Sequence, residues 1–146
     1  MAKVRVLNGP NLNLLGQREP GTYGQRSLHH IMQDLEQFAA GCGVQLEHLQ
    51  TNSEGGMVDA IQQAGKDGID YIIINPAAYT HTSVAIRDAL LAVEIPFVEV
   101  HLSAVSAREP FRQVNYFSDI AIGVISGFRG ESYLLALQAI LNRIEP

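Results

Sequence analysis

The sequence has 146 residues, no tryptophan and a single cysteine, Cys42. No disulfide can therefore form within the chain, which agrees with a reducing, cytoplasmic location. Cys42 lies in a run with helical spacing, so we expect it to be a small core residue and not a nucleophile. The sequence also lacks an apolar run long enough to span a bilayer and a signal-peptide core at its N-terminus, so no membrane association is expected. The length fits a single catalytic domain, residues 1–146.

The sequence has few charged residues, and its net charge is negative. Lys and Arg total 10 against 15 Asp and Glu, which gives a net charge of −5 and a pI of about 5.4. Scattered cations on an acidic chain argue against general nucleic-acid binding. If the ligand is an anion, donors placed within a site must attract it, because the overall charge does not.

Motifs that would hold a cofactor or a metal, or activate a nucleophile, are also missing. The histidines have neither zinc-finger nor His-Glu-x-x-His spacing, so no metal is expected. There is no Walker loop, and no Gly-x-Gly-x-x-Gly follows the first apolar run, so no nucleotide cofactor is expected. Gly-x-Ser-x-Gly is absent as well. The polar residue types that remain are Tyr, His, Arg, Glu and Asn, a set that suits cofactor-free proton transfer beside a carbonyl.

The sequence does contain a regular alternation of strand-like and helix-like runs, which predicts an α/β fold with a parallel sheet. We expect a flavodoxin-like three-layer sandwich with a five-stranded parallel sheet in the order 2-1-3-4-5. The expected strands are Val4–Asn8, Val44–Leu49, Ile69–Asn75, Phe97–His101 and Ile120–Ser126. The expected helices are one that begins after Ser27, then Met57–Ala64, Val84–Val93 and Ser132–Ile144.

Polar residues follow three strands that this order makes neighbours. The first strand ends at Asn8 and leads into Asn11, the third ends in the segment 75–83, and the fourth ends in the segment 99–103. In open parallel sheets, ligands bind beyond the carboxyl ends of the strands, near the point where the strand order reverses. We therefore expect the functional site at this edge of the sheet.

Glu99 interrupts an apolar strand, and His101 follows two residues later on the same face. Two solvated side chains on an edge strand would be the commoner explanation of such a pair. This strand is the fourth of the five that we expect, and it adjoins the other polar strand ends. We therefore favour a site in which the carboxylate organises the groups around it and His101 transfers protons.

Three other positions are candidates for the same site. The loop from Leu7 to Gly24 is long and rich in glycine, and it carries Arg18 and Tyr23, as a mobile catalytic segment would. His81 lies among hydroxyl-bearing residues where a strand leads into a helix, and the free N–H groups at a helix start suit an anion. Arg112 could fork onto hydroxyls or a carboxylate, whereas Arg108 fits an ordinary surface arginine equally well. The candidates here are Arg18, Tyr23, His81, Arg108 and Arg112.

Several uncommon motifs occur together, and in this order and spacing they resemble the type II 3-dehydroquinases (3-dehydroquinate dehydratases) along nearly the whole chain. The motifs are Leu7–Asn13, Arg18–Pro20, Tyr23–Gly24, Asn75–Ser83, Glu99–Ser103 and Arg108–Arg112. The resemblance implies a flavodoxin-like fold and a homododecamer built as a tetramer of trimers. It implies the dehydration of 3-dehydroquinate to 3-dehydroshikimate, in the shikimate or quinate pathway, with no metal, cofactor or Schiff base.

The resemblance also implies roles for single residues. Tyr23 would be the base that removes a proton beside the ketone, Arg18 its electrostatic partner, and Asn11 a group that stabilises the enolate through a water. His101 would protonate the leaving hydroxyl, and Glu99 would orient nearby groups. The residues implied in holding the substrate are Asn75, His81, Arg112, Leu102 and Ser103 through backbone N–H, and Asp88 from a neighbouring subunit.

The chain departs from the family pattern at Arg129, where the family usually has a glycine, so we expect the turn around it to differ. Two other protein classes share the expected architecture. A flavin-binding electron carrier would need a phosphate loop rich in Ser, Thr and Gly at positions 8–13. A receiver-type regulatory module would need clustered acidic residues after the first strand and an aspartate in place of Asn75. The chain matches neither pattern well.

Overall fold

The computed structural model describes residues 1–17 and 26–144 of the chain. The described residues form one sheet of five parallel strands in the order β2-β1-β3-β4-β5. The strands are β1 (Lys3–Asn8), β2 (Gln45–Gln50), β3 (Tyr71–Asn75), β4 (Phe97–His101) and β5 (Gly123–Ser126). The α-helices are α2 (Leu28–Gly41), α3 (Glu54–Lys66), α4 (Val84–Val93) and α5 (Glu131–Ile144).

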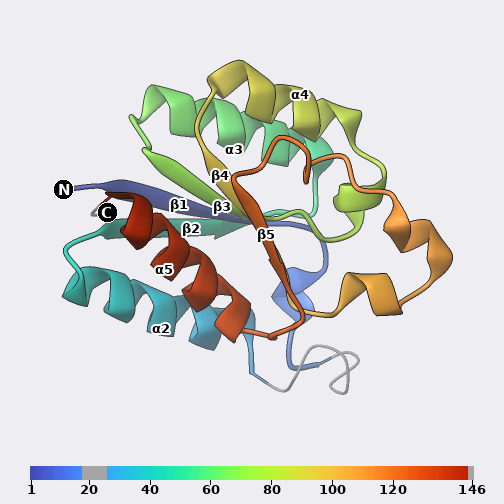
Figure 1. Ribbon diagram of the computed structural model, residues 1–146, viewed down its shortest axis with the longest axis horizontal. Helices are drawn as coiled ribbons and strands as arrows, with labels where there is room; N and C mark the ends of the chain where they lie inside the picture. Colours follow the sequence, from blue (N-terminus) through green and yellow to red (C-terminus); the bar gives the residue numbers. More distant parts are fainter. Residues whose placement is uncertain (18–25, 145–146) are drawn as a thin grey trace.

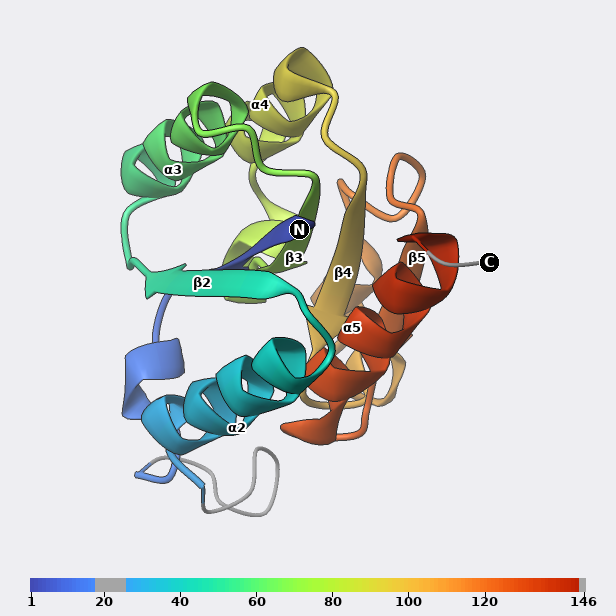
Figure 2. The same ribbon diagram turned by 90° about the vertical axis from the view of Figure 1, so that its left-hand side faces the viewer.

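The helices cover the two faces of the sheet in pairs. Helices α3 and α4 lie on one face, and α2 and α5 lie on the other (Figure 1 and Figure 2). This arrangement confirms the predicted three-layer sandwich, and the strand order is the predicted one. In the part of the chain that is described, none of the helices has the length and apolar character needed to cross a membrane.

Strand β3 shows why the sheet is buried on both sides. Ile72, Ile73 and Ile74 are all fully buried. Successive side chains of a strand point to opposite faces, and here Ile73 packs in the core under α2 and α5, while its two neighbours pack under α3 and α4. Burying each such side chain contributes roughly 1.5–3 kcal/mol relative to leaving it exposed. A continuous apolar run is therefore what a central parallel strand requires.

Serine side chains set the starts of three helices. The Ser53 hydroxyl accepts a hydrogen bond of 2.9 Å from the backbone N–H of Gly56, so α3 begins three residues before the expected Met57. Ser27 and Ser83 cap α2 and α4 in the same way. Helices α2 and α4 begin where the sequence predicts, because the serine hydroxyl satisfies a backbone donor that a helix start leaves unpaired.

The prediction for the last strand was wrong at its beginning. Strand β5 starts at Gly123 and not at Ile120. The backbone N–H groups of Ile120 and Ala121 both bond to the carbonyl of Phe117, at 3.1 and 3.0 Å, so this stretch is a turn. Apolar side chains there fill the core without pairing with β4, which is why hydrophobicity alone suggested a longer strand.

The prediction for Cys42 was also wrong, because its side chain is exposed. Cys42 follows the last residue of α2, and its backbone N–H bonds to the carbonyls of Phe38 and Ala39 at 3.2 and 3.0 Å. Gly43 comes next with a φ of +73° and ends the helix. The apolar periodicity of α2 therefore stops just before the cysteine.

Candidate active site

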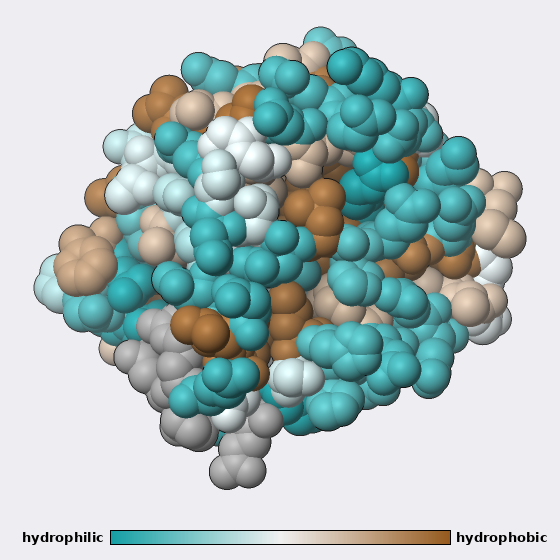
Figure 3. All heavy atoms as spheres, turned by 180° about the vertical axis from the view of Figure 1, so that it is seen from behind, coloured by the Kyte–Doolittle hydropathy of each residue, from teal (hydrophilic) through white to brown (hydrophobic). Residues whose placement is uncertain are grey.

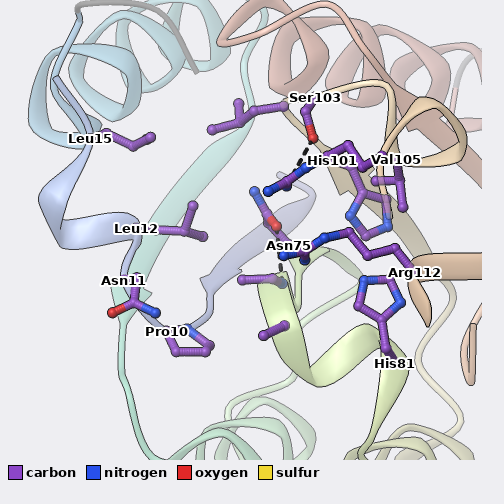
Figure 4. A pocket seen from close by; sticks show the side chains of 14 residues that line it. Pro10, Asn11, Leu12, Leu15, Asn75, His81, His101, Ser103, Val105 and Arg112 are labelled. Atoms are coloured by element: carbon purple, nitrogen blue, oxygen red, sulfur yellow. Dashed lines mark hydrogen bonds between the residues drawn. The ribbon is translucent and has the colours of Figure 1, made fainter. Parts of the chain in front are cut away.

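A cavity of about 140 Å³ lies at the carboxyl ends of β1, β3 and β4. Its position is the one that the reversal of strand order between β1 and β3 predicts. Figure 4 shows side chains from the segments that follow these strands converging on one space. The residues that line it are Pro10, Asn11, Leu12, Leu15, Asn75, Ala77, Ala78, His81, His101, Leu102, Ser103, Val105, Arg108 and Arg112.

Glu99 and His101 lie together in β4, all of whose residues are buried. The Glu99 carboxylate is fully buried, and its Oε2 atom is hydrogen-bonded to Nε2 of His101. The His101 ring also lines the cavity. This burial excludes the explanation that the two side chains are solvated on an edge strand. No cluster of acidic, histidine or cysteine side chains within residues 1–17 and 26–144 has a geometry that could hold a metal ion.

Asn75 is held by a buried hydrogen-bond network that the sequence did not reveal. Its Nδ2 donates to the Tyr133 hydroxyl at 3.0 Å, and its Oδ1 accepts from the Ala77 N–H at 3.2 Å. The Tyr133 hydroxyl in turn donates to Oδ1 of Asn8 at 2.6 Å. Burial raises the pKa of Tyr133 above its usual range, against a smaller lowering by the Asn75 hydrogen bond, so the phenol stays neutral. The network fixes the side-chain amide of Asn75 before any ligand arrives.

His81 ends a short 3-10 helix, Ala77–His81, on the opposite side of the cavity from Asn11 (Figure 4). Its Nδ1 lies 2.6 Å from the backbone carbonyl of Val114. A carbonyl only accepts hydrogen bonds, so Nδ1 carries a proton. Burial lowers the pKa of His81, and the charge of Arg112 lowers it further, while the hydrogen bond to Val114 raises it. With a lowered pKa the ring is neutral near pH 7, and its Nε2 can accept a hydrogen bond.

Two arginines give the cavity the local positive charge that the chain as a whole lacks. Arg112 Nε donates to Oε1 of Glu109 at 2.7 Å, and Arg108 Nη1 lies 3.5 Å from the Ser103 hydroxyl. The Arg112 hydrogen bond is the main reason why the pKa of Glu109 is lowered to about 2. Arg108 lines the cavity, although a surface position was equally expected for it. Its spacing of four residues from Arg112, soon after β4, was the available signal.

Backbone hydrogen bonds and dihedral angles position two further cavity residues, Asn11 and Leu102. Asn11 has a φ of +69°, and its N–H donates to Oδ1 of Asn52 at 3.0 Å. The carbonyl of Leu102 accepts a hydrogen bond of 2.9 Å from the N–H of Arg129. Arg129 itself has a φ of +53°, a left-handed conformation that costs a non-glycine residue about 1–2 kcal/mol. Arg129 therefore holds, in the turn that supports Leu102, a conformation that glycine adopts without a steric penalty.

Four predicted site residues are not among those that line the cavity in the described structure. Arg18 and Tyr23 lie outside the described residues. Asp88 is exposed on α4 and does not line the cavity of its own chain. Glu99 reaches the cavity only through His101.

A family profile described as "Dehydroquinase class II" matches residues 2–141 of the chain. The chain belongs to this family. As a type II 3-dehydroquinate dehydratase it is a hydro-lyase, so the alternatives of a flavin carrier and a receiver module are set aside. Its sequence is 59% identical over 145 residues to 3-dehydroquinate dehydratase 1 of Pseudomonas aeruginosa, with 99% of each chain covered.

Solved structures agree with this assignment of the type II dehydroquinase. The crystal structure of the type II dehydroquinase from Butyrivibrio crossotus matches with a TM-score of 0.93 and 41% identity, covering 97% of each chain. The type II dehydroquinase from Propionibacterium acnes matches with a TM-score of 0.92 and 39% identity, again covering 97% of each chain. The predicted family and fold are therefore confirmed over nearly the whole chain.

Proposed function

We propose that this cavity dehydrates 3-dehydroquinate to 3-dehydroshikimate through an enolate, as a step of the shikimate pathway, without a metal, cofactor or Schiff base. The observation that carries the proposal is the buried Glu99–His101 pair at the edge of a small polar cavity. A histidine bonded to a carboxylate is suited to proton transfer. The other polar side chains that line the cavity are two amides, the Ser103 hydroxyl, a neutral histidine and two arginines.

These groups suit a ring that carries hydroxyls and one carboxylate. Asn75 uses one of its two amide hydrogens on Tyr133, so the second can bind a substrate hydroxyl. His81 Nε2 can accept from another hydroxyl. Arg112 and the backbone N–H groups of Leu102 and Ser103 are the proposed partners of the carboxylate. Holding both the carboxylate and the hydroxyls fixes the ring, so that the reacting carbons have a single orientation.

Tyr23 is the proposed base for the first step, and its phenolate removes the proton beside the ketone. A tyrosine has an ordinary pKa near 10, so half ionisation at neutral pH requires a shift of about 3 units, or roughly 4 kcal/mol. Desolvation alone moves a phenol the wrong way. Close cations in a site that excludes water are therefore needed, and Arg18 and Arg112 are the proposed source. Asn11 stabilises the enolate through a bridging water, an effect of the oxyanion-hole type.

His101 is the proposed acid for the second step. The enolate expels the hydroxyl group from the neighbouring carbon, and His101 gives that group a proton so that it leaves as water. One proton is removed from carbon and one is delivered to oxygen, so the net loss is one water molecule. The carboxylate of Glu99 stabilises the charged imidazole before the transfer and orients its ring.

An ultraviolet assay with 3-dehydroquinate tests the proposal, because the product is a conjugated enone. The enzyme is assayed untreated, after a chelator, and after borohydride in the presence of substrate. We expect absorbance to rise equally in all three, and Tyr23→Phe to remove nearly all of the activity. Loss after the chelator would contradict the metal-free mechanism, and loss after borohydride would reveal a Schiff base. No turnover by the untreated enzyme would contradict the proposed function itself.

We also propose that the chain works in the cytoplasm as a homododecamer, a tetramer of trimers, in which Asp88 completes the site of a neighbouring subunit. The exposure of Asp88 on α4 supports this, as does the exposure of two apolar side chains of the same helix, Val84 and Leu91. Light scattering coupled to gel filtration tests the assembly. In a mixture of Asp88→Ala and His101→Ala subunits, activity should recover if the two residues meet across an interface, and a failure to recover would contradict the shared site.

A further inference from the structure

Asn115 lies in the irregular segment between the 3-10 helix Pro110–Gln113 and β5, in no motif singled out from the sequence. Its side-chain amide has only one consistent orientation. Its Oδ1 accepts hydrogen bonds from the backbone N–H groups of Phe117 and Ser118, at 2.7 and 2.8 Å. An amide oxygen is the only one of the two amide atoms that can accept. The nitrogen must therefore be the atom that faces Glu99, and Nδ2 lies 2.6 Å from Glu99 Oε2.

The same carboxylate oxygen thus receives two donors. Glu99 Oε2 is bonded to Nδ2 of Asn115 and to Nε2 of His101, whereas no described residue donates to Oε1. A charged carboxylate that is buried away from water is costly unless it is paired and hydrogen-bonded. The hydrogen bond from the neutral Asn115 amide offsets part of this cost, because it stabilises the ionised form of the carboxylate. Asn115 therefore acts on the protonation of the Glu99–His101 pair and not only on the local turn.

We infer that Asn115 is a positioning residue for the acid of the reaction. Its amide keeps Glu99 ionised, so the carboxylate holds the Nε2 proton of a doubly protonated His101 ring, and the second ring proton, on Nδ1, is the one handed to the leaving hydroxyl. This inference rests on the proposed role of His101. Asn115 acts through Glu99, because it does not itself line the cavity.

Mutations can separate the role of the Asn115 amide nitrogen, which donates to Glu99, from that of its oxygen, which accepts from the turn. Asn115→Asp keeps an oxygen that accepts from the turn but replaces the donor to Glu99 with a second acceptor. Asn115→Ala removes both halves. We expect kcat to fall about ten- to a hundredfold in both variants, the range for the loss of a hydrogen bond to a charged group, with KM within about twofold. Asn142→Asp makes the same change of charge at an exposed site on α5 and is the matched control.

A turn-cap role alone predicts a different order of activities. Asn115→Asp would then keep the kcat of the wild type, and only Asn115→Ala would lose activity. That result would overturn the inference. A loss confined to KM would overturn it as well, because a residue outside the cavity that positions the acid acts on the chemical step.

Nitrogen-15 NMR of the histidine rings tests the inference without any turnover, and it also applies if Asn115→Asp fails to fold. In the wild type, the His101 Nε2 signal should be that of a protonated nitrogen. In Asn115→Ala it should move toward an unprotonated nitrogen, because Glu99 takes up the proton. The variant leaves in place the other charged or titratable side chains that line the cavity, which are His81, Arg108 and Arg112.

An unchanged Nε2 signal in Asn115→Ala would overturn the inference. If the signal shifts in Asn115→Ala but the wild-type enzyme does not dehydrate 3-dehydroquinate, the proposed function is overturned. The effect of Asn115 on the Glu99–His101 pair would then still stand. The two failures are therefore distinguishable.

Discussion

Arg5 and Glu99 are both buried charged residues of the central sheet, but they lie toward opposite ends of it. Toward the amino ends, the Arg5 guanidinium donates to Glu47 at 2.7 Å and to Asp67 at 2.9 Å, so each of two donor nitrogens has its own carboxylate. Toward the carboxyl ends, Glu99 receives both of its donors on one oxygen, and one of them is His101 at the cavity. The first charge is compensated in place, whereas the second is coupled to a group that can move a proton.

This comparison predicts that the two ends respond differently to mutation. Substitutions around Arg5 should change the free energy of unfolding and leave kcat unchanged. Substitutions around Glu99 and His101 should lower kcat by more than any loss of folded protein explains. The variants below test this division or the residues that join its two sides, beginning with the largest expected effect.

His101→Ala should lower kcat by about 10²–10⁴-fold, the usual contribution of a positioned acid or base. The ring is also hydrogen-bonded to the fully buried Glu99 carboxylate, so its loss should lower the free energy of unfolding as well, by about 1–3 kcal/mol. Steady-state kinetics and thermal unfolding on one preparation measure both quantities. Retention of wild-type turnover would show that His101 is not the acid.

Arg5→Ala should lower the free energy of unfolding by about 1–2 kcal/mol, because it removes two hydrogen bonds between charged groups. The value is at the low end because the Glu47 and Asp67 side chains are 52% and 39% exposed, so solvent screens them. Urea unfolding gives the stability, and kcat measured on the same sample should equal that of the wild type. A fall in kcat under conditions where the variant is fully folded would contradict the claim that Arg5 acts on stability alone.

Tyr133→Phe should affect both properties, because Tyr133 joins the buried core to the cavity. Loss of the hydroxyl leaves Asn8 Oδ1 and one Asn75 hydrogen without their present partners, at about 1–3 kcal/mol. We also expect a several-fold rise in KM, because Asn75 is no longer held. Tyr71→Phe, at the first residue of β3 and away from the cavity, is the matched control. Equal effects of the two variants would show that the network does not position Asn75.

Arg129→Gly should have the smallest effect, a gain of about 0.5–1 kcal/mol, because glycine adopts a φ of +53° without a steric penalty. Glu94→Gly is a suitable comparison, since Glu94 has a φ of +56° at the end of α4, away from the cavity. Chemical denaturation measures both. If only Arg129→Gly altered KM, the turn beside Leu102 would be shown to tune the site.

The parts of the fold that depend on local pattern were predictable from the sequence. The apolar run of β3 and the serine caps of α2 and α4 act over a few residues, so their positions follow from the chain itself. The reversal of strand order then located the cavity, because the carboxyl ends of β1, β3 and β4 must meet. The start of β5 was not predictable in this way, since Ile120 and Ala121 pack against the core without forming a strand.

The contacts that tune the site were not predictable, because they join residues far apart in the sequence. Tyr133 lies 58 residues from Asn75, and its apolar ring fits an amphipathic helix whether or not its hydroxyl is used. Asn115 lies 16 residues from Glu99 in an irregular segment, where asparagine ordinarily indicates a turn. Sequence pattern therefore identified residues at the cavity edge, and three-dimensional packing identified the residues that hold them.

The most direct test of the central claim is to measure deuterium exchange into 3-dehydroquinate by His101→Ala in D₂O. In the proposed mechanism, proton removal by Tyr23 and departure of the hydroxyl with a proton from His101 are separate steps. We predict that His101→Ala exchanges the hydrogen beside the ketone while forming almost no 3-dehydroshikimate, and that Tyr23→Phe does neither. Product formation by His101→Ala at the rate of the wild type would contradict the account.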